Sequence, residues 1–226
     1  MRRGPSGSVS EKSSSPSPAL FVFDECETAG LDGFAAGIDE AGRGPLAGPV
    51  VAAAVVLYRK SDFFHLNDSK QVTVSRRESL YQEIIRHALV GIGVVDEKRI
   101  DEINIYQATR LAMKQAVLNL PITPSLLLID GNLRLDLPIE QKAIIRGDQK
   151  SATIAAASIV AKVYRDAWME HLDERYPGYG FKQHKGYGTP YHLDRIREKG
   201  PSDVHRKSFA PIHRTRENLL HEASAE

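Results

Sequence analysis

The chain turns from apolar to acidic to glycine-rich within one short stretch, residues 37–44, which reads Gly-Ile-Asp-Glu-Ala-Gly-Arg-Gly. A second apolar run follows at residues 50–57, so the pattern predicts a strand, a tight turn and a buried strand. Neighbouring strand residues point to opposite faces, so Asp39 and Glu40 can serve one metal ion only if the strand ends or bulges there. We expect the glycine and proline turn at residues 42–45 to supply that bend.

Strands and helices alternate along the rest of the chain. Helical periodicity predicts a helix over residues 73–87, with Ser75 or Thr73 as its N-cap, and a second one over residues 105–118. Apolar runs predict strands at residues 89–95 and 126–129 and a shorter one at 143–145, and an Ala/Ile/Val-rich segment predicts a long buried helix over 152–172. This alternation indicates an α/β sheet.

Two further acidic residues lie near predicted strand ends, where ligands bind in α/β sheets. Asp130 closes the apolar run 126–129, and Asp148 precedes the long helix, where it could cap the helix or bind metal. Any one of these acids alone is more often a helix cap or a solvated group. Four carboxylates at one crevice instead favour a hard cation, Mg²⁺ or Mn²⁺, and two such ions about 4 Å apart can clamp a phosphodiester.

The glycines at positions 42, 44 and 48 also resemble a phosphate-binding loop. A dinucleotide fingerprint opens a helix after a strand, whereas here Pro45 and Pro49 intervene and another strand follows. We therefore exclude a dinucleotide site. Glycines without side chains let the backbone approach a sugar or phosphate, which suits recognition of a polynucleotide.

Composition restricts the class of protein without identifying it. The 226 residues, 42% of them hydrophobic, suffice for one folded unit, and 30 Lys and Arg against 29 Asp and Glu leave no global basic field. The single cysteine, Cys26, cannot form an internal disulfide, and no apolar run has the length of a membrane span. We expect a cytoplasmic monomer without membrane association. We expect a domain over residues 34–215, a disordered tail over 1–33 and a C-terminal tail over 216–226.

Residues 37–50, which read Gly-Ile-Asp-Glu-Ala-Gly-Arg-Gly-Pro-Leu-Ala-Gly-Pro-Val, resemble the signature of the ribonuclease HII family. Supporting segments follow in order at residues 68–70, 129–132, 147–151, 155–163, 184–189 and 205–209, so the resemblance covers residues 35–213. One departure is Gln71, where the family usually carries a second lysine.

The resemblance implies a ribonuclease H-like fold, with a mixed central sheet flanked by helices and a C-terminal helical part. It implies that Asp39, Glu40, Asp130 and Asp148 are the acidic active-site residues and hold two Mn²⁺ or Mg²⁺ ions during catalysis. By the same resemblance, Gly42-Arg43-Gly44 and Tyr187 sense the ribose 2′-hydroxyl, and Lys70, Lys150, Ser151 and Lys185 are further substrate contacts.

The implied activity is an endoribonuclease that hydrolyses the RNA strand of RNA/DNA hybrids and cuts 5′ of ribonucleotides embedded in duplex DNA. Such an enzyme leaves a 3′-hydroxyl and a 5′-phosphate and serves ribonucleotide excision repair and RNA primer removal. Basic residues in the C-terminal quarter either neutralise phosphates or form a solvated face: Lys182, Lys185, Arg195, Arg197, Lys199, Arg206 and Lys207. His184 and His205 fit a structural or phosphate-contacting role better than metal binding.

Two alternatives remain open from the sequence. Ribonuclease HIII acts on RNA/DNA hybrids, but it lacks the glycine-arginine-glycine sensor and carries an extra N-terminal domain, unlike the Ser/Pro-rich start of this chain. A nucleic-acid-binding module without catalysis is the other alternative, and the presence of all four acids argues against it.

Overall fold

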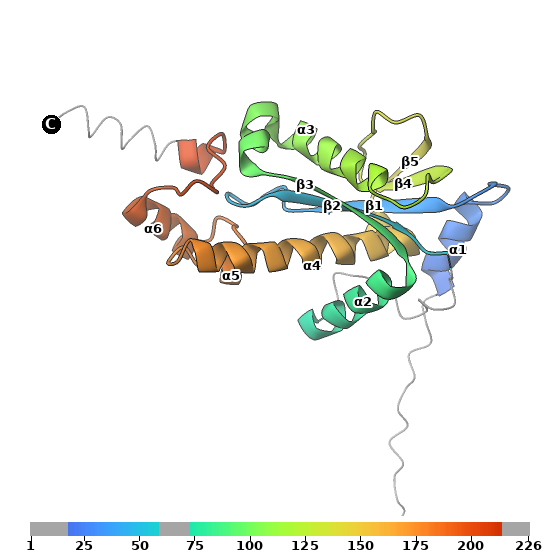
Figure 1. The fold of residues 1–226 in the computed structure, drawn as a ribbon, viewed down its shortest axis with the longest axis horizontal. Coiled ribbons are helices and arrows are strands. Elements are labelled where there is room, and N and C mark those ends of the chain that lie inside the picture. The colour runs from blue at the N-terminus through green and yellow to red at the C-terminus, as the bar shows by residue number, and fades with distance from the viewer. Residues whose placement is uncertain (1–17, 59–72, 214–226) are drawn as a thin grey trace, which may run out of the picture.

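The computed structural model describes residues 18–58 and 73–213 (Figure 1). Five strands form one sheet: β1 (Ala35–Ala41), β2 (Val50–Val56), β3 (Leu89–Val95), β4 (Leu126–Asp130) and β5 (Glu140–Ile144), in the order β3-β2-β1-β4-β5. β1 is antiparallel to β2 and β2 to β3, whereas β1 runs parallel to β4 and β4 to β5. The sheet is therefore mixed, which confirms the predicted ribonuclease H-like architecture.

Helices cover both faces of the sheet (Figure 1). α3 (Glu97–Leu118) lies on one face, and α4 (Ala152–Arg175) lies on the other. α1 (Pro18–Glu27) and α2 (Val74–His87) pack on the α4 side, and α5 (Phe181–His184) and α6 (Pro190–Lys199) form the C-terminal helical part. Each helix in the described part of the chain is too short or too polar to cross a membrane.

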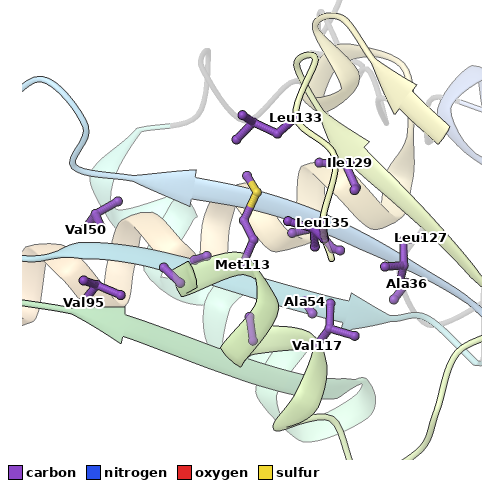
Figure 2. Packing of buried hydrophobic residues seen from close by; sticks show 14 of the residues in the cluster. Ala36, Val50, Ala54, Val95, Met113, Val117, Leu127, Ile129, Leu133 and Leu135 are labelled. Atoms are coloured by element: carbon purple, nitrogen blue, oxygen red, sulfur yellow. The ribbon is translucent and has the colours of Figure 1, made fainter. Parts of the chain in front are cut away.

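The hydrophobic core has one cluster on each face of the sheet, and alternate residues of β2 belong to different clusters. Val50, Ala52, Ala54 and Val56 belong to a cluster with α3, where Met113 and Val117 lie over the strands (Figure 2). Ala53 and Val55 belong instead to a cluster with α4. Every residue of β2 is buried, so the run predicted as a buried strand is covered on both faces.

A close backbone approach fixes α4 against β1. A Cβ on Gly37 would lie 2.1 Å from the carbonyl carbon of Thr153, in the first turn of α4. Any side chain at this position would push the helix away from the strand. Glycine here brings α4 next to the strand that carries Asp39 and Glu40.

One predicted helix, α2, agrees with the structure, whereas α3 and β5 differ from it in extent. α2 begins where expected, with Thr73 as its N-cap, because the Thr73 hydroxyl accepts the Arg76 N–H at 3.3 Å. α3 begins at Glu97 rather than near residue 105, since Asn104 with φ 65° kinks the helix and interrupts its periodicity. β5 begins at Glu140, earlier than the predicted 143–145, because it is an edge strand whose polar residues give no apolar run.

The N-terminal boundary was placed too late. Residues 18–27 form α1 instead of part of a disordered tail, and Leu20 and Phe21 are each only 5% exposed, in the cluster with α4. The Asp24 carboxylate also accepts the backbone N–H of Thr153 at 3.0 Å. This apolar and polar anchoring makes α1 part of the folded unit. Residues 1–17, Lys70 and the predicted C-terminal tail lie outside the described residues.

Candidate active site

Asp39 and Glu40 lie inside a regular strand. Asp39 pairs with Ala53 and Glu40 with Ala52, and the pairing continues through Ala41. Contrary to the prediction, the strand neither ends nor bulges at the acids, because pairing with β2 keeps the backbone extended through Ala41. The charges of Glu40 and Asp130 nevertheless both act on Asp39, so the three carboxylates lie near one another without that bend. Asp39 is 7% exposed, and its Oδ1 accepts the backbone N–H of Glu40 at 2.7 Å.

Asp130 reaches the same place from the neighbouring parallel strand. Ile38 of β1 pairs with Ile129 of β4, so the next residues, Asp39 and Asp130, follow side by side at the carboxyl ends of the two strands. Ligand sites of α/β sheets form at such ends. Asp130 Oδ1 accepts the backbone N–H of Gly147 at 2.6 Å, which ties it to the turn that contains Asp148.

Asp148 lies in a short 3-10 helix, η3 (Gly147–Gln149), immediately before α4, and is 2% exposed. It does not cap α4, which was one of its two predicted roles. The cap is Ser151, whose hydroxyl accepts the Ile154 N–H at 3.2 Å. Asp148 is thus a buried acid that directly follows Gly147, the residue whose N–H donates to Asp130.

The pKa values of Asp39 and Glu40 are both raised. Burial raises the pKa of Asp39 well above its usual range, and the charges of Glu40 and Asp130 raise it further. Burial also raises the pKa of Glu40, while the Arg43 guanidinium, 3.2 Å from its Oε1, lowers it. Such crowding of negative charge is offset most directly by a bound cation, and oxygen donors select a hard one.

The carboxylates are close without being gathered around one point. In residues 18–58 and 73–213, no three His, Cys, Asp or Glu side chains are arranged as a metal-binding group. The chemistry of the donors fits Mg²⁺ or Mn²⁺, and side-chain rotation would have to complete the geometry. Metal binding by the four acids remains a prediction.

The glycine loop, residues 42–49, adjoins the acids. Gly42 has φ 96°, and a Cβ there would lie 2.0 Å from Arg165 Nε, so only glycine fits this position. Gly44 differs, because a Cβ there would meet only Cε1 of Tyr187, at 3.6 Å. The glycine at position 44 leaves open space in front of the tyrosine ring.

A cavity of about 350 Å³ lies between the glycine loop, α2 and α4. Of the predicted residues, Glu40, Gly42, Arg43, Gly44 and Tyr187 line it, and Tyr187 is 48% exposed. Three cationic residues that the sequence did not single out, Arg77 of α2 and Lys162 and Arg165 of α4, line it as well. Ser158 and Lys162 are four residues apart on α4, so they lie on the same face of this helix. This helical spacing is the sequence signal that could have identified Lys162 as a cavity residue.

The other predicted substrate contacts have different positions. Ser151 is fully buried as the cap of α4, so its hydroxyl is not at the surface of the cavity. Lys185 Nζ lies 2.9 Å from Glu170 Oε1 in an ion pair, and Lys150 is exposed next to η3. Arg206, grouped by sequence with phosphate-neutralising or solvated residues, is fully buried.

His205 is also buried, as a structural role requires. Its Nε2 lies 3.1 Å from Nε2 of His192, and its Nδ1 accepts the Ser202 N–H at 2.9 Å. His192 Nδ1 in turn lies 2.8 Å from the carbonyl oxygen of Tyr187. The sequence interpretation did not select His192, although this contact makes it the support of the Tyr187 backbone.

Comparisons with known proteins concern the sequence as a whole and the fold. The sequence model of the family "Ribonuclease HII" matches residues 36–212. A ribonuclease HII of Bacillus cereus is 57% identical over 182 residues, covering 79% of this chain and 70% of the relative, and that of Enterococcus faecalis is 54% identical over 178 residues, covering 78% and 69%. The crystal structure of ribonuclease H2 from Pyrococcus horikoshii superposes with a TM-score of 0.70 at 26% identity, covering 83% of this chain and 99% of that one.

Proposed function

Because the chain belongs to the ribonuclease HII family, we propose that it cuts nucleic acid on the 5′ side of ribonucleotides, including single ones embedded in duplex DNA. Membership makes it a ribonuclease H hydrolase, an endonuclease that acts on RNA/DNA hybrids. One observation carries the finer proposal. Crowded carboxylates on β1 and β4 adjoin a cavity lined by the glycine loop and Tyr187.

The acids would hold the divalent ions. Asp39, Glu40 and Asp130 form the first group of ligands in this proposal, and Asp148 completes a second site or positions water. When bound, two ions polarise the phosphodiester and lower the pKa of the attacking water. The product ends would be a 3′-hydroxyl and a 5′-phosphate.

The cations around the cavity would bind the phosphates that flank the cut. Arg43, Arg77 and Lys162 line the cavity, and together they supply a local positive field that the net charge of +1 does not. Lys162 is held in place by Asp166, whose Oδ1 lies 2.6 Å from its Nζ. The cations thus face the substrate backbone next to the acids.

The glycine loop and Tyr187 would recognise the sugar. The 2′-hydroxyl is the group that distinguishes RNA from DNA, and the exposed loop backbone at Gly44 can approach it closely. The Tyr187 ring, half-exposed beside Gly44, would stack on the deoxyribose that follows. This pairing of contacts favours a ribonucleotide followed by DNA, which is the junction found in ribonucleotide excision repair and primer removal. We include in the proposal a monomeric, cytoplasmic enzyme. The single cysteine fits the reducing compartment, and measurement of the molecular mass in solution tests the oligomeric state.

The test is cleavage of three matched duplexes, with one ribonucleotide, with none, and with a continuous RNA strand, each with Mn²⁺, with Mg²⁺ and with chelator. We expect a single cut 5′ of the lone ribonucleotide, with the all-DNA duplex intact and no cleavage in chelator. Cleavage of the continuous hybrid alone would instead indicate the specificity of ribonuclease HIII. Binding of all three duplexes without cleavage would indicate a nucleic-acid-binding module.

A further inference from the structure

Two arginines are the largest fully buried side chains of the described residues: Arg165 of α4, which is 1% exposed, and Arg206, after α6, which is 0% exposed. Burying a guanidinium is costly unless its donors are satisfied, and it has five of them. Both arginines place their donors on backbone carbonyl oxygens, and most of these belong to the glycine loop.

Arg206 joins the two ends of the glycine loop. Its Nη2 donates to the carbonyls of Gly42 at 2.6 Å and Gly48 at 2.7 Å, and its Nε donates to Gly48 at 3.0 Å. Its Nη1 donates to the carbonyl of Arg43 at 3.0 Å. The carbonyls of two consecutive residues at the proposed ribose contact are therefore fixed by one guanidinium.

Arg165 connects the glycine loop to the Tyr187 loop, residues 185–189. Its Nε donates to the carbonyl of Pro49 at 3.0 Å and its Nη2 to that of Ala47 at 3.2 Å. Its Nη1 donates to the carbonyl of Lys185 at 3.0 Å, two residues before Tyr187. A backbone hydrogen bond from Leu46 N–H to the Gly186 carbonyl, at 2.8 Å, adds a second link between the two loops.

Glu97 offsets the two buried cations. It is the first residue of α3 and is 8% exposed. Burial, followed by the charge of Arg165, lowers the pKa of Arg206 to about 9, and Glu97 acts against this shift. Arg206 therefore stays charged at neutral pH, and it makes four hydrogen bonds to the loop.

We propose that Arg165 and Arg206 are positioning residues for ribose recognition, which hold the glycine loop and the Tyr187 loop as one rigid unit. Arg206 acts through Gly42 and Arg43, and Arg165 acts through the backbone beside Tyr187. The inference rests on the proposed function, because it assumes that these two loops contact the sugars. Lysine would keep the charge but cannot reproduce the planar fork of donors.

The test compares Arg165→Lys and Arg206→Lys with the wild type, with Tyr187→Ala, and with Arg175→Lys, an exposed arginine at the end of α4. We measure kcat/KM on a duplex with one ribonucleotide and on a continuous RNA/DNA hybrid, together with the thermal midpoint. We expect each buried-arginine variant to lose about tenfold more on the single ribonucleotide than on the hybrid, since a small misplacement of contact groups has large kinetic effects. Arg175→Lys should leave this ratio unchanged.

A double variant separates positioning from general destabilisation. If Arg165 acts through Tyr187, Arg165→Lys in the Tyr187→Ala background should not change the substrate ratio further. Equal losses on both substrates, or an additive change of the ratio, would overturn the inference. A wild type that does not distinguish ribonucleotides from DNA would instead overturn the proposed function.

Hydrogen exchange of the wild type decides the matter if neither lysine variant folds. The N–H of Gly48 donates to Val204 at 3.0 Å and that of Leu46 to Gly186, so a rigid unit predicts exchange as slow as in β1. Slow exchange at both amides would support the inference. Fast exchange at either one would show a loop that the arginines do not hold, and would overturn it.

Discussion

The acids and the glycine loop are adjacent in sequence but are held by different means. Asp39 and Glu40 stand on strand backbone whose partners in β2, Ala53 and Ala52, follow a regular register. The loop that begins at Gly42 is held by the side chain of Arg206, 164 residues further along the chain. The proposed chemistry therefore depends on sheet register, and the proposed sugar recognition depends on long-range polar contacts.

The largest expected effect concerns the acidic residues on β1. Asp39→Asn should reduce cleavage by a factor of about 10³ or more, because the proposed metal contact is worth several kcal/mol in the transition state. The fold should survive, since the amide has the same shape and removes a buried charge. Single-turnover cleavage and the thermal midpoint measure the two effects. Asp136→Asn, an exposed partner of Lys114, is the control and should change neither. Turnover by Asp39→Asn near the wild-type rate would remove Asp39 from the proposed site.

The second expected effect contrasts two glycines of the loop. Gly42→Ala should lower the free energy of unfolding by about 3 kcal/mol, because φ 96° is strained for alanine and its Cβ would meet Arg165 Nε and the Pro49 carbonyl. Gly44→Ala should leave stability within about 0.5 kcal/mol, since its Cβ makes an ordinary contact with Tyr187. Its cleavage of a single ribonucleotide should nevertheless fall about tenfold, because the methyl group occupies the space in front of the ring. Urea unfolding and kcat/KM distinguish the two variants. Equal stability of both would mean that the loop is not held as described.

The same contrast explains what could be predicted from the sequence. The apolar run of β2 and the acids at the ends of apolar runs are local signals, so an α/β sheet and the neighbourhood of Asp39 and Asp130 could be predicted from the residues, whereas the mixed topology was implied only by the family resemblance. The regular pairing through Asp39 and Glu40 could not, because it depends on how far β2 holds the strand.

Residues that act over long sequence distances were misplaced or missed. Arginine is usually a surface residue, so the sequence indicates an exposed position for Arg206. Only the fold shows that backbone carbonyl groups accept its hydrogen bonds. Ser151 resembles a substrate contact by its segment, but its position before α4 makes it a helix cap. The N-terminal helix α1 is stabilised by packing against α4, a tertiary contact, so its helical form could not be predicted from this short segment alone.

The third expected effect is a loss of stability at acidic pH, caused by the two buried histidines that support the Tyr187 loop, His192 and His205. Burial lowers the pKa of His192 to about 4 and that of His205 to about 3. An unfolded histidine titrates near 6.5, so below that pH the unfolded chain binds more protons and stability falls as pH drops toward 4. At pH 5 one such histidine costs about 2 kcal/mol. Urea unfolding at pH 7 and pH 5 measures this cost.

A matched pair of variants tests whether His192 causes the loss of stability at acidic pH. His192→Gln should flatten the dependence of stability on pH, because the glutamine does not titrate and can still donate to the Tyr187 carbonyl. His171→Gln, at an exposed position of α4, should leave the dependence as in the wild type. An identical dependence on pH in His192→Gln and in the wild type would contradict the buried, neutral state of His192.

The smallest expected effect returns to the acids and concerns metal binding without substrate. Burial and the charge of Asp130 raise the pKa of both Asp39 and Glu40, so a bound cation should stabilise the folded chain by offsetting their charge. Mn²⁺ at tenfold its dissociation constant would add about 1.4 kcal/mol. The required rotation of side chains keeps the affinity modest, because no group of three ligands is arranged in advance in the described residues.

Thermal midpoints with and without Mn²⁺ measure this gain, and Asp39→Asn should abolish it, while Asp136→Asn should retain it. Amide exchange at Leu46 should not respond to the ion, since the hydrogen bonds made by the loop backbone to Arg206 and Gly186 involve none of the acids. An equal rise in Asp39→Asn would place the ion elsewhere. A response of Leu46 to Mn²⁺ would show that the two regions are coupled rather than independently built.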